Sequence, residues 1–306
     1  MSAVLAVDGG QSGIRLRHSA QNRIVEVDGV SRAGDTEASV AQSIADGWIR
    51  GGFPAIDRVV LGLTTAPVDA VRANRLCSLV ATATGAREVW VADDTVTSHA
   101  GALSGGYGIS LVAGTGVACL AVPEHGDPKA FDGHGYLLGD DGGGFWIGRA
   151  ALREVLRARD RSQSISLAGA AWARYGELDG LHVRLHDSSS TVNDIAQFAR
   201  DVLSAAEGDT IARRIVDDAA TELHSTIMDA AQYIGGRGIP IALGGRLLQS
   251  GSPLRTRLDD LIGHSDALVP RSADAGALDG AIRLGLADDP GHYRGLVHCW
   301  KDAIIT

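Results

Sequence analysis

Short apolar runs, each ending at glycine or polar residues, recur along the first third of the chain. Residues 3–7, 58–63 and 88–92 have the length and composition of buried strands. Residues 14–17 alternate between apolar and polar positions, and residues 23–27 are separated from them by a polar turn, which predicts two more strands. The pattern therefore opens with three consecutive strands before the first helical segment.

Helical spacing appears between these runs. Val40, Ile44 and Trp48 are four residues apart, and Asp35 or Thr36 precedes them as a capping residue, so a helix is expected there. Further helices are expected over residues 68–83 and 94–103. The first third then has the order β-β-β-α-β-α-β-α.

The rest of the chain repeats this theme. Residues 108–113 and 117–122 are apolar and flank a glycine turn, which predicts a hairpin. Helices are expected over residues 143–159, 164–174, 191–206, 209–234 and 273–286, and a buried strand is expected over residues 239–243. We therefore predict two related α/β halves that face each other across a cleft.

Composition restricts the class of protein. The 306 residues include 40 glycines and carry a net charge of -9, which disfavours a nucleic acid or an anionic membrane as a partner. Three widely spaced cysteines argue against a disulfide framework, and no apolar stretch approaches the roughly 20 residues of a membrane span. We expect a cytoplasmic globular protein.

Two glycine turns are candidate phosphate sites, namely Asp8-Gly9-Gly10-Gln11-Ser12-Gly13 and Gly114-Thr115-Gly116. Glycine lets backbone N–H groups converge on an anion, and a carboxylate such as Asp8 at a strand end suits a hydrated Mg²⁺. Each turn alone could equally be an ordinary hairpin. Two similar turns, one in each half, favour binding of a phosphate chain. No GxxxxGK[ST] string is present, so neither turn is a P-loop of that class.

Two consecutive carboxylates follow the predicted strand 88–92. Asp93 is in the position of a helix N-cap, and we interpret it so. Asp94 is the better candidate for a general base, because strand ends hold such groups rigidly.

A glycine-rich segment, residues 133–148, precedes the predicted helix 143–159. Its carboxylates Asp140 and Asp141 could bind sugar hydroxyls or could cap the helix, and we expect at least one to be functional. Phe145 and Trp146 are expected in the core. Strand 239–243 ends at Gly244 and Gly245, which would allow a flat ring such as adenine to approach the backbone.

Taken in order, these segments resemble one family. The resemblance is to the N-acetylglucosamine kinase branch of the BadF/BadG-type ATPases, within the actin, sugar kinase and heat-shock chaperone superfamily. It rests on the segments VDGGQSG, the DDT strand end, VAGTGVACL, GHGYLLGDDGGGFWIG and IALGGRL. The resemblance spans residue 4 to about residue 285. Residues 135–148 are its most specific part.

The resemblance implies an α/β fold of two ribonuclease-H-like domains, each with a mixed five-stranded sheet flanked by helices. We expect domains over residues 1–113 and 114–287, with the tail 288–306 packing on the first. By this resemblance Asp8 orders Mg²⁺, Asp94 is the catalytic base and contacts the sugar, and Asp140 and Gly135 hold sugar hydroxyls. The ATP-binding set is Gly9, Gly10, Gln11, Ser12, Gly114, Thr115, Gly116, Gly244 and Gly245.

The expected activity is ATP-dependent phosphorylation of an amino sugar, N-acetylglucosamine, on its 6-hydroxyl. The family turn DGGGTKT is DGGQSGI here, and GTGSNC is GTGVAC, which places the carbon-2 substituent of the sugar in question. A glucosamine kinase, an activating ATPase of an acyl-CoA dehydratase or reductase, and a non-catalytic nucleotide switch stay as alternatives. Whether the protein is a homodimer stays open as well.

Overall fold

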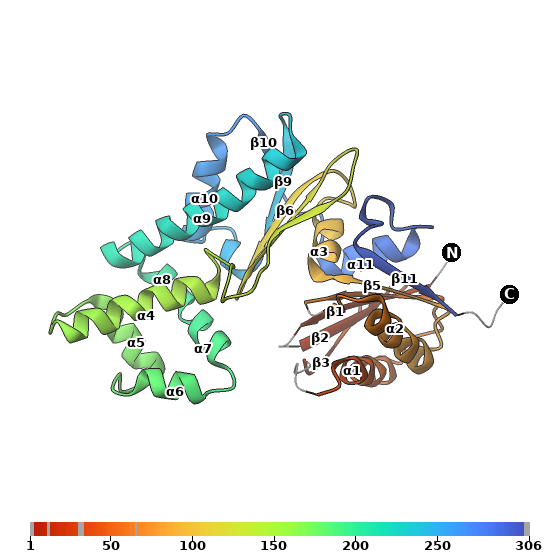
Figure 1. The fold of residues 1–306 in the computed structure, drawn as a ribbon, viewed down its shortest axis with the longest axis horizontal. Helices are drawn as coiled ribbons and strands as arrows, with labels where there is room; N and C mark the ends of the chain where they lie inside the picture. The colour runs from red at the N-terminus through yellow and green to blue at the C-terminus, as the bar shows by residue number, and fades with distance from the viewer. Residues whose placement is uncertain (1–2, 11–12, 30–33, 65, 303–306) are drawn as a thin grey trace. The chain divides into compact units, whose positions relative to one another are not determined.

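The structure, a computed structural model, describes residues 3–10, 13–29, 34–64 and 66–302. Its contacts divide the chain into two compact units (Figure 1). The first unit comprises Met1–Ser110, Val122–Pro128 and Ser272–Thr306, and the second comprises Leu111–Ala121 and Lys129–Arg271. Within the described ranges, no helix has the length and apolar character needed to cross a bilayer.

A mixed sheet of six strands forms the centre of the first unit, in the order β11-β5-β4-β1-β2-β3. The central strands β1, β4 and β5 are parallel, whereas β2, β3 and β11 pair antiparallel with their neighbours. The strands are β1 (Val4–Gly10), β2 (Gly13–His18), β3 (Ile24–Val27), β4 (Arg58–Leu63), β5 (Glu88–Asp93) and β11 (Val297–Lys301). The predicted mixed sheet is confirmed, but it has six strands instead of five, because the tail adds β11 to the edge at β5.

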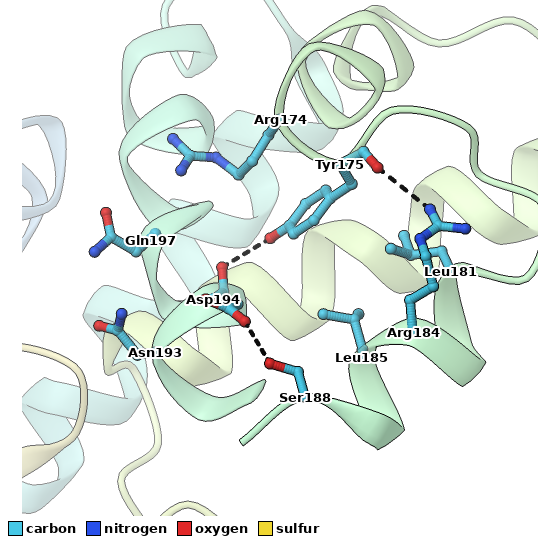
Figure 2. A pocket seen from close by; sticks show the side chains of 9 residues that line it. All are labelled: Arg174, Tyr175, Leu181, Arg184, Leu185, Ser188, Asn193, Asp194 and Gln197. Carbon is cyan, nitrogen blue, oxygen red and sulfur yellow. Dashed lines mark hydrogen bonds between the residues drawn. The ribbon is translucent and has the colours of Figure 1, made fainter. Parts of the chain in front are cut away.

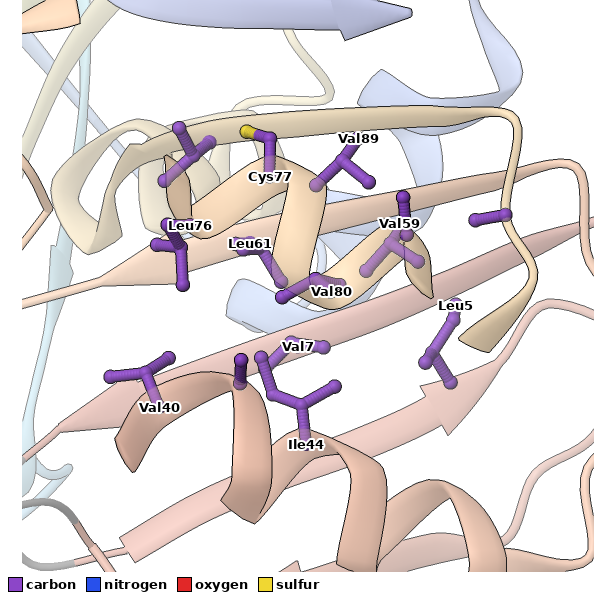
Figure 3. Packing of buried hydrophobic residues seen from close by; sticks show 14 of the residues in the cluster. Leu5, Val7, Val40, Ile44, Val59, Leu61, Leu76, Cys77, Val80 and Val89 are labelled. Atoms are coloured by element: carbon purple, nitrogen blue, oxygen red, sulfur yellow. The ribbon is translucent and has the colours of Figure 1, made fainter. Parts of the chain in front are cut away.

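Helices cover both faces of this sheet. They are α1 (Thr36–Gly51), α2 (Ala70–Thr84), α3 (Asp94–Ala102) and α11 (Ala277–Leu286), with a short 3₁₀ turn, η2 (Gly291–Tyr293). Alternate strand residues such as Leu5, Val7 and Leu61 meet Ile44 of α1 and Leu76 of α2 in one buried cluster (Figure 3). The other strand residues face α11, since an added Cβ at Gly285 would lie 2.5 Å from Val4 and 2.9 Å from Val60.

The first helix begins and ends where its sequence dictates. The Asp35 carboxylate accepts a hydrogen bond from the Ala38 backbone amide, which satisfies one of the free amides at the start of α1. Gly52 follows the helix in the left-handed conformation, as glycine permits. The predicted cap at Asp35 is confirmed.

The second unit repeats the strand order of the first. Its sheet has the order β10-β9-β6-β7-β8. The strands β6, β7 and β8 are consecutive in sequence and lie side by side, as β1, β2 and β3 do in the first unit. The later strands β9 and β10 extend the sheet beyond β6, as β4 and β5 extend the first sheet beyond β1. The strands are β6 (Gly108–Ala113), β7 (Val117–Val122), β8 (Lys129–Asp132), β9 (Ile239–Gly244) and β10 (Leu268–Arg271). Because both sheets share the ribonuclease-H-like core order, the predicted fold class is confirmed.

Helices make up most of the second unit. They are α4 (Gly144–Asp160), α5 (Ser166–Tyr175), α6 (Leu181–Asp187), α7 (Thr191–Gln197), α8 (Ala199–Ala205), α9 (Thr210–Ile234) and α10 (Pro253–Gly263), with the 3₁₀ turn η1 (Arg246–Leu248). The single helix predicted over residues 191–206 is wrong, because the chain breaks at Phe198 into α7 and α8.

The compact units differ from the predicted domain limits in three stretches: residues 111–113 belong to the second unit, and residues 122–128 and 272–287 belong to the first. Helix α11, expected in the second domain, packs on α3 and β1 and belongs to the first unit. The limits 1–113 and 114–287, and the cleft between the domains, stay predictions.

Candidate functional site

The first unit collects polar groups at the carboxyl ends of its parallel strands. Gly9 of β1 pairs with Leu63 of β4, and Leu63 pairs with Asp93 of β5. Asp8, Thr64 and Asp94 therefore lie at one edge of the sheet, where open α/β sheets bind ligands. The register brings the predicted metal ligand and the predicted base to the same edge.

The start of the first glycine turn fits closely against β4. An added Cβ would lie 2.7 Å from the Leu63 side chain at Gly9 and 2.9 Å from the Thr64 hydroxyl at Gly10. The Thr64 amide donates to the Gly9 carbonyl at 3.0 Å. A larger residue at either position would therefore force the Leu63 or Thr64 side chain to move. Gln11 and Ser12, also predicted here, lie outside the described residues.

Asp8 forms an ion pair with Arg15, its partner in the β1–β2 register. The Asp8 side chain is largely buried, whereas that of Arg15 is 51% exposed. Arg15 was not among the predicted site residues, although its place two residues after the turn in an antiparallel hairpin could have indicated it. Thr64 was not predicted either, because a single threonine after a strand is no motif.

The two carboxylates after β5 have different roles in the fold. Asp93 caps α3 by accepting from the Thr95 amide at 3.0 Å, so that prediction is confirmed. Asp94 is the first residue of the helix, and burial, together with the negative charges of Asp93 and Asp8, raises its pKa to about 7. A hydrogen bond from Thr64 opposes this rise in pKa. A carboxyl group with such a pKa can exchange a proton near neutral pH.

Helix α3, which carries Asp94, is fixed against α11 by glycines. An added Cβ at Gly280 would lie 1.9 Å from the Thr97 carbonyl oxygen, so the two backbones touch. Arg283 of α11 donates to the carbonyls of Ala100 and Gly101 at 2.8 and 3.0 Å, which satisfies acceptors at the C-terminal end of α3.

A buried histidine of α3 ties this helix to Tyr293 and Gly108. His99 Nδ1 lies 2.7 Å from the Tyr293 hydroxyl and Nε2 lies 3.2 Å from the Gly108 carbonyl. Because a carbonyl can only accept, Nε2 carries the proton and Nδ1 accepts from Tyr293. Burial lowers the pKa of His99 to about 4, so the ring stays neutral.

In the second unit, the Gly114-Thr115-Gly116 turn is tied to the start of α4. The Gly144 amide donates to the Gly114 carbonyl and the Phe145 amide donates to the Thr115 carbonyl, each at 2.9 Å. The Gly144 and Phe145 amides are therefore already bonded, whereas a capping Asp140 or Asp141 carboxylate would need free amides at the start of α4. The N-cap of α4 is Gly143, without a side-chain hydrogen bond, so the capping alternative for the two carboxylates is wrong.

Asp140 lies directly against this turn. An added Cβ at Gly116 would be 2.2 Å from Asp140 Oδ2. The carboxylate accepts hydrogen bonds from the backbone of Val117 and Gly135, which lower its pKa, but burial outweighs them and the pKa is raised. The Asp132 carboxylate accepts from the Asp140 amide at 2.7 Å and so orients the residue. The structure thus brings Asp140, Gly135 and the turn together.

The aromatic residues of this segment serve packing. Phe145 is buried and its ring centroid lies 4.9 Å from that of Tyr136, which confirms the core placement predicted for Phe145. Trp146 is only half-buried, and Asp141 is exposed.

Gly244 and Gly245 at the end of β9 lie beside β6. Gly245 has φ +92°, and an added Cβ would be 2.1 Å from the Ala113 carbonyl oxygen, so only glycine fits. The predicted adenosine residues therefore adjoin the predicted phosphate turn within the same unit.

The strand edge of the first unit fits a hard cation. Asp8 and Asp94 offer carboxylate oxygens there. The pKa of Asp94 is raised first by burial and then by the charges of Asp93 and Asp8, and a cation would offset that negative charge. Among the described residues, no three His, Cys, Asp or Glu side chains are grouped so as to hold a metal. Mg²⁺ does not need such a group, because it usually binds one or two carboxylates and keeps several waters or phosphate oxygens.

A separate cavity of about 490 Å³ lies among α5, α6 and α7 (Figure 2). It is lined by Arg174, Tyr175, Leu181, Arg184, Leu185, Ser188, Asn193, Asp194 and Gln197. Its two cations are already bound: Arg184 donates to backbone carbonyls, including Asp179 at 2.7 Å, and Arg174 pairs with Asp201 at 2.6 Å. None of the predicted site residues lines this cavity.

Comparison with known proteins identifies the family. Residues 22–281 match the model of the BadF/BadG/BcrA/BcrD ATPase family, which is most of the chain. This chain belongs to that family. The resemblance inferred from the sequence motifs is thereby confirmed at the level of the family.

The curated relatives are distant. An N-acetylmuramic acid/N-acetylglucosamine kinase of Clostridium acetobutylicum is 28% identical over 166 residues, 51% of this chain and 52% of the relative. An N-acetyl-D-glucosamine kinase of Dictyostelium discoideum is 29% identical over 42% of each chain. The chain thus matches about half the length of these relatives or less.

A solved structure extends the likeness to the whole fold. A candidate N-acetylglucosamine kinase of Chromobacterium violaceum superposes with a TM-score of 0.72, covering 93% of this chain and 99% of the other at 24% identity. At this identity the likeness shows the fold alone.

Proposed function

We propose that the protein phosphorylates an amino sugar at the expense of ATP, with N-acetylglucosamine as substrate and its 6-hydroxyl as the acceptor. The observation that carries the proposal is Asp94, a buried carboxyl group whose pKa is raised to about 7 at the strand edge that also holds Asp8. Membership of an ATPase family and relatives named as amino-sugar kinases support it.

In this proposal the glycine turns bind the phosphate chain of ATP. The groups assigned to this role are Gly9, Gly10, Gln11 and Ser12 of the first turn and Gly114, Thr115 and Gly116 of the second. The carbonyls of Gly114 and Thr115 already accept from α4, and the Gly114 amide donates to the Gly116 carbonyl at 2.9 Å. The amides of Thr115 and Gly116 are therefore the groups of this turn that are assigned to phosphate. Gly244 and Gly245 accommodate the adenosine.

The sugar is assigned to Asp94, Asp140 and Gly135. Asp140 is fixed by two backbone amides and accepts from sugar hydroxyls, and Asp94 accepts the proton of the attacking hydroxyl. Asp8 would hold Mg²⁺, which supplies positive charge for the phosphoryl oxygens in the transition state. Most of the rate enhancement is then positioning, because phosphoryl transfer asks little covalent chemistry of the protein.

The test is ADP release by the purified protein with a panel of hexoses and amino sugars. N-acetylglucosamine should give the highest kcat/KM, and Asp94→Asn should lower kcat by about 10²–10⁴, the range for loss of a general base. Turnover of Asp94→Asn close to wild type would refute the role of Asp94. ADP release that no sugar stimulates would refute the kinase.

Glucosamine is the second candidate substrate. Asp141 is exposed and close enough to Asp140 to influence its pKa, and a carboxylate there could pair with a sugar ammonium. Asp132 is a second acid close to Asp140, and its carboxylate already accepts from the Asp140 amide. A higher kcat/KM for glucosamine than for N-acetylglucosamine, lost in Asp141→Asn, would favour this alternative.

The activating-ATPase alternative needs cysteines that can hold an iron–sulfur cluster. Cys77 and Cys119 are buried on α2 and β7, and Cys299 lies on β11. Burial raises the pKa of Cys77 to about 12, which disfavours the thiolate that a cluster requires. An iron-free protein that still turns over would exclude this alternative.

A further inference from the structure

Two aspartates of the second unit have a backbone conformation that residues with side chains normally avoid. Asp132 and Asp140 have φ angles of +58° and +60°, in the left-handed region that glycine occupies without strain. They enclose residues 133–139, which begin where β8 ends and finish immediately before the carboxylate assigned to the sugar. Such a conformation persists only where surrounding contacts hold it, and it is concentrated at functional sites.

The segment between the two aspartates is tied into a compact turn. The Leu138 and Gly139 amides donate to the Gly135 carbonyl at 3.0 and 2.9 Å. The Asp132 carboxylate closes the turn by accepting from the Asp140 amide at 2.7 Å. A side chain at Gly139 would displace this carboxylate, since an added Cβ would lie 2.5 Å from Asp132 Oδ1. The Asp132 side chain therefore ties the end of β8 to Asp140.

The backbone of Asp132 is fixed independently of its side chain, because Asp132 pairs with Ala118 in the register of β7 and β8. Among the residues that the structure describes, the Asp132 carboxylate has no ion-pair partner, and the Asp140 amide is the donor from which it accepts. Loss of the carboxylate would leave the strand pairing in place and free the Asp140 backbone.

We propose that Asp132 is a positioning residue of the sugar site, which sets the affinity for the sugar by fixing the backbone of Asp140. This inference rests on the proposed function, because Asp140 is the residue assigned to sugar hydroxyls. The Asp140 carboxylate accepts from the amides of Val117 and Gly135, and the orientation of its backbone decides whether it reaches both. A displacement of about 1 Å in a positioned group can cost about 100-fold in rate.

A purely structural role, in which Asp132 only stabilises the loop, is the competing explanation. The two explanations differ in the effect of glycine at this position. Glycine adopts φ +58° without strain, so Asp132→Gly removes the carboxylate while it relieves the backbone. A positioning residue would then lose function without a loss of stability, whereas a structural residue would lose stability first.

The experiment measures ADP release by the full chain, with N-acetylglucosamine and ATP varied in turn, and sugar affinity by isothermal titration. The variants are Asp132→Gly and Asp132→Asn, the second of which keeps an acceptor oxygen and tolerates the left-handed conformation. The matched control is Ser162→Gly, which makes the same backbone change at φ +56°, beyond the other end of α4. Thermal melts are recorded for each variant.

Asp132→Gly should raise both KM and Kd for the sugar by about 10- to 100-fold, as expected for loss of a hydrogen bond to a charged acceptor, and should change KM for ATP by less than about twofold. Its Tm should stay within about 3 °C of wild type. Asp132→Asn should stay within about threefold of wild type for the sugar, because a neutral acceptor retains the bond. Ser162→Gly should match wild type in every kinetic constant.

Unchanged sugar affinity in Asp132→Gly, or an equal loss in Asp132→Asn, would overturn the inference and leave the kinase proposal intact. A KM for ATP that rises as much as that for the sugar, or a Tm lowered by more than the stated range, would overturn it too, because loss of loop order would then explain the effect. A wild-type protein that neither binds nor phosphorylates any sugar of the panel would instead overturn the proposed function itself.

Discussion

Replacing Gly116 with alanine should displace the carboxylate that we assign to the sugar. The added Cβ would lie 2.2 Å from Asp140 Oδ2 and 2.7 Å from its Cγ, whereas ordinary contacts begin at 3.4 Å. The carboxylate would therefore have to move by roughly 1 Å, away from the amides of Val117 and Gly135 that hold it. The effect is steric, because the φ angle of Gly116 is outside the range that only glycine favours.

A misplacement of about 1 Å in a substrate-positioning group can lower kcat/KM by about 100-fold, equivalent to about 2.7 kcal/mol. We expect a loss of this size for Gly116→Ala when ADP release is measured against sugar concentration at saturating ATP. Gly169→Ala is the matched control, because an added Cβ on that α5 residue has no neighbour within 4 Å.

A double-mutant cycle tests whether the loss runs through Asp140. Asp140→Ala removes the atoms that the new Cβ would strike, so adding Gly116→Ala to that variant should cost little more. If Gly116→Ala lowers kcat/KM by the same factor with and without the Asp140 side chain, the steric reasoning is refuted.

Four further predictions concern pH and stability. The pKa of Asp94 is raised to about 7, and this group must lose its proton to act as the base, so kcat/KM should rise with pH through about 7. A flat profile of kcat/KM from about pH 5 to 9 would contradict this. Tyr293→Phe removes the donor to buried His99 and should lower the free energy of unfolding in urea by about 1–3 kcal/mol. The pKa of His99 is lowered to about 4, so the unfolded chain takes up the proton first, and the stability contributed by the neutral ring should be lost as pH falls from about 6.5 toward 4. Arg58→Met leaves Glu88 with Lys301 as its remaining partner and removes the donor to the Gly285 and Ala287 carbonyls. It should cost about 1–3 kcal/mol in the same urea titration, and a loss close to zero would show that these bonds contribute little.

The central strands and their neighbouring helices could be predicted from the sequence, because burial dictates their patterns. Residues 58–63 form β4 as expected, and their six side chains are all buried. Strands β8 and β10 were missed since each has only four residues and exposes half of them or more. Such strands owe their existence to a partner strand that local sequence does not reveal.

The break between α7 and α8 could not be predicted for a similar reason. No proline or glycine interrupts residues 191–206. The break follows from packing: an added Cβ at Gly148 of α4 would be 2.0 Å from the Ile195 carbonyl, and the Phe198 amide bonds that carbonyl in a tighter turn. Helix α4 thus shapes α7 through a contact between segments far apart in sequence.

The candidate site shows the same limit. Asp8, Asp94 and Asp140 could be proposed from their motifs. Arg15, Thr64 and Asp132 could not, because strand register and loop conformation bring them to the site. Each becomes visible only when the strand pairing and the bonds to Asp8, Gly9 and Asp140 are known.

Strand β11 has a consequence for synthesis of the chain on the ribosome. It completes the sheet of the first unit by pairing with β5, yet it is translated after all of residues 111–271, which form the second unit. Until then β5 presents an unpaired edge of the kind that recruits other strands in aggregation. Helix α11 and the Tyr293 hydroxyl that bonds His99 arrive equally late. The unit that translation begins first is thus completed only after the second unit has been made, and a nascent chain stalled before residue 297 carries an open sheet.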